Sequence, residues 1–287
     1  FDFWVLKLNP DGTVAWQKAY GGVGDELAYS IQPIGDKFIV AGKWIPVNGN
    51  YNFWIIFIPG GGGNTLEWQK IYEAAAGTSN EVALSIRQTS DGGYIVAGWT
   101  DASGSVDMWV LKLTSNGAVE WEKTYGGPGI DWANSIRQTS DGGYIVAGTI
   151  NSYSGYWILK LANDGTVVWQ KTYGGTGEAR LIQQTSDGGY IVAGHTSSFG
   201  AGLKDIWVLK LNGDGDVVWQ KTYGGGDDDE ARSIQQTSDG GYIVAGSTKS
   251  FGAGLKDIWV LKLNDDGTVA WQKTYGGASD DEANSIQ

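Results

Sequence analysis

The sequence repeats itself along most of its 287 residues. A Trp-Val-Leu-Lys-Leu segment or a worn variant of it starts at six places, which are Trp4, Trp54, Trp109, Trp157, Trp207 and Trp259. The period is therefore 48 to 55 residues. Residues 185–226 and 237–278 are identical at 36 of 42 positions. Self-similarity at a period of this length is typical of repeat architectures, in which each copy is one supersecondary unit.

Each period predicts four short antiparallel strands. In the last full copy they are expected at 233–237, 242–246, 257–263 and 269–275, where apolar and polar residues alternate. Asp-Gly and Gly-Gly pairs separate the first strand from the second and the third from the fourth, and these residues accept the positive φ of tight hairpin turns. No segment predicts a convincing helix. Four strands repeated six times predict an all-β, six-bladed β-propeller.

The propeller is expected to be one domain, residues 1–287, with one blade divided between the two ends. The blade units are expected at 1–20 plus 283–287, 27–72, 82–125, 133–173, 180–223 and 232–275. The divided blade has its third and fourth strands at the start of the chain and its first strand at the end, and it lacks a second strand. A gap leaves backbone groups unpaired, which is costly. Either a continuation of the chain or a strand donated by another molecule is expected to fill it.

Composition argues against several classes of protein. The chain has no cysteine and one histidine, which excludes a disulfide framework and thiolate chemistry and leaves little for histidine-based catalysis. The net charge of −12 argues against nucleic acid as a partner, and no apolar run is long enough for membrane insertion. No Ser-His-Asp arrangement or phosphate-cradling loop is found, so no catalytic residue and no organic cofactor is predicted. These observations lean against an enzyme without deciding the question.

The repeat motifs also resemble those of a known group of proteins. They are Asp-Gly-Gly-Tyr-Ile-Val-Ala-Gly, then Asp-Ile-Trp-Val-Leu-Lys-Leu, then Trp-Gln-Lys-Thr-Tyr-Gly-Gly. This series is similar to repeat arrays in secreted or surface β-propeller proteins of archaea and some bacteria. The resemblance covers nearly the whole chain and implies an extracellular or cell-surface location. It implies no activity, because the function of these arrays is uncharacterised.

The variable loops carry the net charge. Loops between the second and third strands and between blades are expected on one face, and they hold 18 of the 32 acidic and six of the 20 basic residues. Seven of these acidic residues form two runs: Asp227, Asp228, Asp229 and Glu230, then Asp280, Asp281 and Glu282. Three interpretations stay open, namely a solvated surface, a Ca²⁺ site built from carboxylate and carbonyl oxygens, and a docking patch for a basic partner.

Five further residues depart from the repeat and are candidates for a ligand or partner face. Trp44, Trp99 and Trp132 lie on or beside variable loops, where they serve either local packing or sugar stacking. Arg87 and Arg137 replace a first-strand glutamine and are candidates for lining a central channel.

The sequence therefore predicts a non-enzymatic extracellular module with a structural or interaction role. Its partner is expected to be another protein or a second copy of the chain, which donates a strand to the incomplete blade and so builds a filament. The alternative is a propeller that binds or cleaves glycans through the acidic, tryptophan-bearing face. A deep central pocket with two convergent carboxylates would favour the enzyme.

Overall fold

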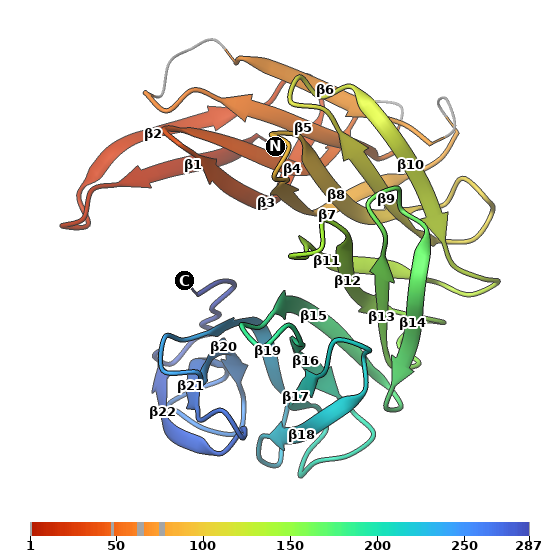
Figure 1. Cartoon of the computed structure of the whole chain (residues 1–287). Helices are drawn as coiled ribbons and strands as arrows, with labels where there is room; N and C mark the ends of the chain where they lie inside the picture. Colours follow the sequence, from red (N-terminus) through yellow and green to blue (C-terminus); the bar gives the residue numbers. More distant parts are fainter. Residues whose placement is uncertain (1, 47–48, 62–65, 75–77, 287) are drawn as a thin grey trace. The chain divides into compact units, whose positions relative to one another are not determined.

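The fold is all-β. The computed structural model describes residues 2–46, 49–61, 66–74 and 78–286, and every regular element in these ranges is a strand (Figure 1). The strands form separate antiparallel sheets. By its contacts the chain divides into two compact units, residues 1–133 and 134–287, and the boundary falls inside β11. Each unit is described here by itself.

The first unit contains three sheets. The first has two strands, β1 (Phe3–Leu8) and β2 (Val14–Tyr20). The second has four: β3 (Asp25–Ile34), β4 (Lys37–Ile45), β5 (Asn52–Ile58) and β6 (Trp68–Tyr72). The third also has four: β7 (Glu81–Gln88), β8 (Tyr94–Thr100), β9 (Asp107–Leu113) and β10 (Val119–Tyr125).

The second unit contains three four-stranded sheets. The first is built from β11 (Trp132–Gln138), β12 (Tyr144–Thr149), β13 (Tyr156–Leu161) and β14 (Val167–Tyr173). The next comprises β15 (Gly177–Gln184), β16 (Tyr190–Thr196), β17 (Asp205–Leu211) and β18 (Val217–Tyr223). The last comprises β19 (Asp229–Gln236), β20 (Tyr242–Thr248), β21 (Asp257–Leu263) and β22 (Val269–Tyr275).

These sheets are the blades of a propeller. Five have four strands in up-and-down order, and the β1–β2 sheet matches the third and fourth strands of a sixth blade. This confirms the predicted six-bladed β-propeller fold. In the described residues β1 pairs only with β2, and residues 281–286 form no strand; Gln287 lies outside the described residues. The N–H of Ile286 donates to Ser233 Oγ at 3.3 Å. The equivalent hydrogen bond joins the first strands of two other pairs of neighbouring blades, from Ile86 to Ser30 and from Ile182 to Ser135.

The core lies between neighbouring sheets and is largely aromatic. The third-strand tryptophans in the five complete blades are between 1% and 5% exposed, whereas Trp4 of the two-stranded sheet is 63% exposed. Fourth-strand tyrosines are tied to the next blade, because the hydroxyl of Tyr223 donates to the Gly267 carbonyl oxygen at 2.5 Å and that of Tyr72 to Gly117 at 2.8 Å. The third-strand tryptophans therefore belong to the packing between blades, whereas Trp271 of the last fourth strand is 45% exposed.

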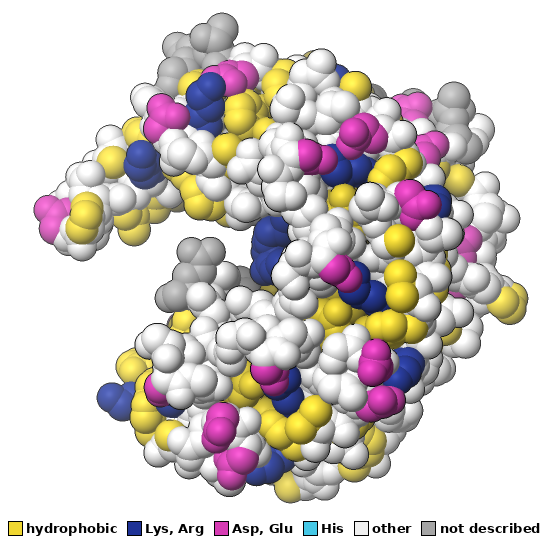
Figure 2. Space-filling view, viewed as in Figure 1, with side chains coloured by type: hydrophobic (Ala, Val, Ile, Leu, Met, Phe, Trp, Pro, Cys, Tyr) yellow, Lys and Arg dark blue, Asp and Glu magenta, His cyan; other side chains and the backbone are white. Residues whose placement is uncertain are grey.

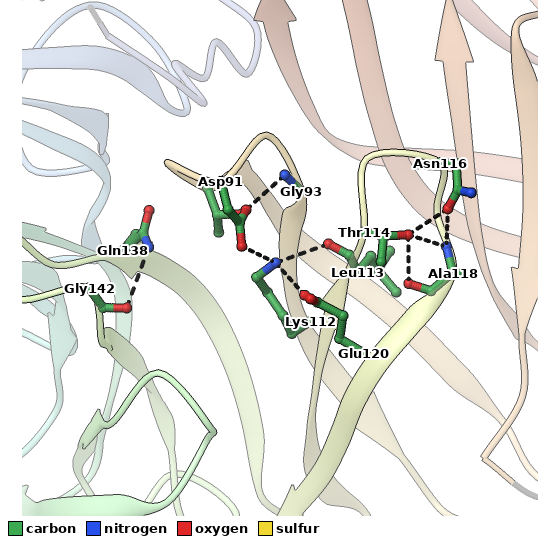
Figure 3. A network of polar contacts seen from close by, with 11 residues as sticks. Asp91, Gly93, Lys112, Leu113, Thr114, Asn116, Ala118, Glu120, Gln138 and Gly142 are labelled. Atoms are coloured by element: carbon green, nitrogen blue, oxygen red, sulfur yellow. Dashed lines mark hydrogen bonds and ion pairs between the residues drawn. The ribbon is translucent and has the colours of Figure 1, made fainter.

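A lysine fastens the first hairpin turn of the repeat to its third strand. Lys112 Nζ contacts Asp91 at 2.8 Å and donates to the Leu113 carbonyl oxygen at 3.2 Å (Figure 3). Asp91 in turn accepts the N–H of Gly93 at 2.8 Å, which holds the turn. The same ion pair recurs in three other blades, as Lys160–Asp141, Lys210–Asp187 and Lys262–Asp239. These repeated lysines are therefore part of the scaffold.

The first strands begin earlier than the sequence pattern predicts. In the last blade the expected start was residue 233, whereas β19 begins at Asp229. A β-bulge between Ala231 and Ser233 interrupts the ladder with β20. A bulge inserts one residue and so breaks the two-residue alternation on which the prediction relied. Asp229 and Glu230 consequently belong to a strand and not to a loop.

Candidate functional site

The variable loops meet where one blade joins the next. The N–H of Asp229, at the start of β19, donates to the Lys204 carbonyl oxygen at 2.7 Å, just before β17 of the preceding blade. An isolated parallel bridge joins Lys204 to Asp228 beside it. We use the word joint for such a place, where the start of the third strand of one blade meets the start of the first strand of the next blade. The same backbone bond recurs from Asp281 to Lys256, from Asp131 to Val106 and from Glu81 to Tyr51.

Three of the seven residues in the two acidic runs, Asp228, Glu230 and Glu282, form ion pairs in the described residues. Glu230 contacts Lys204 at 2.8 Å and Arg232 at 3.6 Å, and Arg232 also contacts Glu282 at 3.6 Å. Glu282 pairs with Lys256, and Asp228 lies 3.1 Å from Lys249. Lys204, Glu230, Arg232, Glu282 and Lys256 thus form one connected series of ion pairs across the last two blades, which we call the charged belt. Burial alone would raise the pKa of Glu230, but Lys204, His195 and Arg232 outweigh it and lower that pKa to about 2.

The remaining acidic residues do not gather as the linear runs suggested. Asp229 and Asp281 each accept the N–H of a loop glycine at 2.9 Å, from Gly225 and Gly277 respectively. In the described ranges no group of three or more His, Cys, Asp or Glu side chains is arranged to hold a metal ion. Ca²⁺ binding by Asp227–Glu230 and Asp280–Glu282 thus stays a prediction, and their observed partners are lysines, arginines and loop amides.

His195, which the sequence analysis did not select as a site residue, is buried near Glu178 and Glu230. It lies on β16 opposite Glu178 of β15 and is 4% exposed. Its Nδ1 atom has no hydrogen-bond partner among the described residues. Burial lowers the pKa of His195, although the charges of Glu230 and Glu178 oppose that effect. Burial therefore favours the neutral imidazole of His195, in spite of the nearby carboxylates of Glu178 and Glu230 from two adjacent blades.

Trp44 lines a pocket in the first unit. The pocket has a volume of about 320 Å³ and is bordered by Trp44, Trp54, Glu26, Lys70 and the glycine turn at 21–22. Glu26 is 3% exposed, and its Oε2 atom has no partner in the described part of the chain. Burial raises the pKa of Glu26. The pocket thus combines two indole rings with a carboxyl and an ammonium group, a mixture that suits a hydroxyl-rich ligand.

A second pocket occupies the equivalent place in the second unit. It has a volume of about 310 Å³ and is lined by Phe199, Trp207, Lys221, Gly174 and their neighbours. Trp207 matches Trp54, and Lys221 matches Lys70, when the repeats are aligned. The ring of Phe199 stands edge-on to Trp207 with centroids 5.0 Å apart. Two equivalent places in the repeat thus hold an aromatic pocket. Only an alignment of the repeats, made with the structure, shows that the two pockets are equivalent.

The structure places the other predicted candidates on strands. Trp99 lies on β8 and Trp132 on β11, and both are half-buried. Arg87 of β7 donates to the Ile86 carbonyl oxygen at 2.6 Å, and burial lowers its pKa to about 10. Arg137 of β11 has a buried Nη1 atom without a partner in the described residues. None of these four borders the two pockets described above.

The surface mixes both signs of charge. On the face seen in Figure 2, acidic side chains stand beside lysine or arginine side chains at several places. This agrees with the ion pairs of the belt and of the hairpin turns. No helix that could span a membrane occurs in the ranges described.

Comparison with known proteins agrees with the fold. A family model described as a domain of unknown function, DUF5122 beta-propeller, matches residues 89–120. This match is confined to one blade, from the end of its first strand to the start of its fourth. A search of curated proteins finds no match.

Several solved propellers are similar in structure. The WD40 domain of Neurospora crassa Pan2 aligns with a TM-score of 0.56 and 12% identity, covering 87% of this chain and 66% of that one. Sqt1 from Chaetomium thermophilum gives 0.53 and 12%, covering 92% and 64%. A protein of unknown function from Dyadobacter fermentans gives 0.56 and 15%, covering 85% and 80%. The chain spans just under two thirds of the Pan2 and Sqt1 chains, and at these identities the likeness establishes the fold alone.

Proposed function

We propose that this chain is a non-catalytic interaction module that accepts an extended strand at the open edge of β1. One observation carries the proposal: β1 has a single partner strand, whereas every other third strand is paired on both sides. An unpaired edge presents a row of N–H and C=O groups that can template a further strand. A propeller fold also supports a binding role in general, because its loops and edges stand on a rigid scaffold.

The incoming strand is defined by the register of the complete blades. In the last blade, Tyr242 lies opposite Leu263, Val244 opposite Leu261 and Gly246 opposite Trp259. Residues 4–8 of β1 have the same Trp-Val-Leu-Lys-Leu sequence as residues 259–263 of β21. A segment with the sequence Tyr-Ile-Val-Ala-Gly therefore fits β1 in the same register, with tyrosine opposite Leu8 and glycine opposite Trp4.

We assign the donor as a second copy of this chain. The required sequence occurs four times in it, at 94–98, 144–148, 190–194 and 242–246. Near-identical copies make exchange between molecules accessible, since a strand from one copy fits the place of another. The resemblance to secreted repeat arrays supports an extracellular setting for such assembly.

The test combines the oligomeric state with a competing peptide. Light scattering after size exclusion is expected to show a concentration-dependent dimer or longer assembly. A peptide covering residues 229–248, the first two strands of the last blade, is expected to bind one-to-one and return the chain to a monomer. The control is the same peptide with Val244→Pro, which removes a backbone donor and distorts the strand. A chain that stays monomeric, or an assembly that the peptide leaves intact, contradicts the proposal.

The pocket at Trp44 favours a second candidate function, which is glycan binding. Two indole rings beside Glu26 and Lys70 offer stacking surfaces and hydrogen-bonding groups in one place. Neutral hexasaccharides of glucose and of N-acetylglucosamine are suitable probes, with tryptophan fluorescence as the readout. Trp44→Ala is expected to abolish the fluorescence change, whereas Trp99→Ala, which removes an indole outside the pocket, is expected to keep it. Equal titrations for both variants would rule out this pocket.

A further inference from the structure

Two buried aspartates meet at the joint between the last two blades. Asp205 starts β17, Asp229 starts β19, and their side chains converge on Gly224. A β-carbon placed on Gly224 would overlap Asp205 Oδ1 and would lie 2.8 Å from Asp229 Oδ2. Asp205 is 1% exposed and Asp229 is fully buried. The glycine therefore makes room for two carboxylates in a place closed to solvent.

In each carboxylate, one oxygen accepts hydrogen bonds from the loops, and the other has no hydrogen-bond partner in the described residues. Asp205 Oδ2 accepts the N–H of Gly202 at 3.0 Å. Asp229 Oδ2 accepts the N–H of Gly225 at 2.9 Å and the hydroxyl of Ser250 at 2.7 Å. The Oδ1 atoms of both residues are buried and have no partner in the structure as described. The loops thus hold the pair in place, and the two oxygens that converge on Gly224 are the unpartnered Asp205 Oδ1 and the loop-bound Asp229 Oδ2.

No basic side chain neutralises the pair. Within the described residues neither Asp205 nor Asp229 forms an ion pair, because Lys204 is engaged by Glu230 and Lys249 by Asp228. Two neighbouring buried carboxylates without a counter-charge are strongly unfavourable. A positive species between the two carboxylates would remove the penalty and give Asp205 Oδ1 a partner.

Aligned joints show that the acidic residues occur in pairs. Asp257 and Asp281 converge on Gly276 in the same way, and two further sets repeat the arrangement, Asp107 with Asp131 on Gly126 and Asp2 with Glu26 on Gly21. Their first-strand members lie 24 residues after the third-strand members in every set. A repeated pair of this kind is not what a randomly acidic, solvated surface would produce.

The two remaining joints sharpen this comparison. At one of them Glu73 stands in the glycine position, and the third-strand residue is then Asn52, whose amide donates to Glu73 at 3.1 Å. With Glu81 the joint again holds two carboxyl groups. At the other joint both acidic positions are glycine, Gly155 and Gly177. At the three aligned positions, which are the glycine, the third-strand start and the first-strand start, each joint therefore carries two carboxyl groups or none.

We propose that a hard divalent cation of the calcium class binds between Asp205 and Asp229 and ties the two blades together. Carboxylate oxygens are the preferred ligands of such ions, and water or loop carbonyl groups complete the coordination. The pair at Asp257 and Asp281 offers the same chemistry at the next joint. The acidic runs are not the site as such: each contributes one residue, and the partner of that residue lies 24 positions earlier in the chain.

Calcium ion alone is the probe for the test. The purified chain, stripped with a chelator, is dialysed to equilibrium against calcium at concentrations up to about 5 mM, since extracellular sites bind with dissociation constants near 10⁻⁴–10⁻³ M. The D205N/D229N double variant is expected to bind one ion fewer per chain than the wild type. Its melting temperature is expected to respond less to calcium than that of the wild type.

The matched control is D227N/D228N, which changes the net charge equally at the neighbouring positions of the same run. It is expected to bind as many ions as the wild type. If the double variant does not fold, the single Asp205→Asn change, which is nearly isosteric, takes its place with the same readout. A wild type that binds no calcium, or the same number of ions bound before and after D205N/D229N, overturns the proposal.

Discussion

Lys210 carries its charge in a largely buried position. The side chain is 7% exposed, and its ammonium group contacts Asp187 at 2.8 Å and the Leu211 carbonyl oxygen at 3.2 Å. Burial alone would raise the pKa of Asp187, but hydrogen bonds from Lys210, Thr185 and Gly189 lower it to about 2. Asp187 thereby accepts the N–H of Gly189 in the hairpin turn and also pairs with the buried ammonium group of Lys210. The repeat preserves this pair in four blades.

The pair makes a testable contribution to acid stability. The pKa of Asp187 is about 2 in the folded chain and about 3.9 when unfolded, so its stabilising effect is complete above pH 4 and disappears as the pH falls through 2. Asp187→Asn is expected to lower the free energy of unfolding at pH 7 by about 1 kcal/mol or less, because Asp187 is 62% exposed. Urea denaturation should show this difference vanishing near pH 2. Asp214→Asn, an exposed change of equal charge, should leave the pH dependence as it is.

His195 predicts a second pH effect at milder acidity. Its pKa is lowered by burial, so the unfolded chain binds a proton more readily between about pH 6.5 and that lower value. Stability is therefore expected to fall as the pH drops below 6.5. His195→Ser, which copies Ser247 at the equivalent position, should remove this fall in urea midpoints measured between pH 7.5 and 5.5. Because the chain has one histidine, equal slopes for both proteins would contradict the prediction.

A β-bulge interrupts the pairing between the first and second strands of several blades. The register between β7 and β8 shifts between Ala83 and Ser85, opposite Gly98. A β-carbon on Gly98 would overlap the carbonyl oxygen of Val82, which belongs to the rigid ladder. The repeated glycine at the end of Tyr-Ile-Val-Ala-Gly is thus needed for close backbone approach and not for a turn. The same overlap recurs at Gly42, Gly194 and Gly246.

Gly98→Ala is therefore expected to destabilise the chain by about 1–3 kcal/mol, the range for overpacking at a site that cannot relax. The control is Gly127→Ala, where a β-carbon would meet nothing within 4 Å and where φ is not positive. That change should stay within about 0.5 kcal/mol of the wild type. Thermal or urea unfolding of the two variants separates the effects. Equal stability would mean that the bulge yields without cost.

At the scale of the whole molecule, four apolar clusters of described residues each lie within one of the two units. Two clusters lie entirely within residues 1–133, around Trp109 and Trp54, and two lie entirely within 134–287, around Trp207 and Trp259. Repeat proteins draw their stability from each repeat and from its contacts with nearest neighbours. The second unit therefore contains the apolar cores that its neighbouring blades share.

A fragment comprising residues 134–287 is accordingly expected to fold by itself, with β-type circular dichroism and a cooperative thermal transition. The matched fragment starts at residue 157, inside β13, and lacks the first two strands of its first blade. It is expected to aggregate or to lose cooperativity, because it exposes the interior of that blade. A fragment 134–287 without a cooperative transition would show that its blades depend on the rest of the chain.

The blades were predictable because their signals are local. Asp-Gly turns, alternating strands and a fixed spacing of tryptophans all act within one period, and they predicted the hairpins and the packing role of residues such as Trp109. The start of β19 was predicted four residues late, because a bulge breaks the alternation. Trp44 was selected as an irregular aromatic residue and does line a pocket, but its neighbours Trp54 and Glu26 were not selected with it.

Residue order and composition were enough for the propeller and its hairpin turns, since both depend on short stretches of chain. Folding alone decides which charges meet. Asp205 faces Asp229 and not its sequence neighbour Lys204, and Glu230 turns instead to Lys204 and Arg232. Such contacts join different blades, and their geometry follows from how backbone hydrogen bonds set one sheet beside the next.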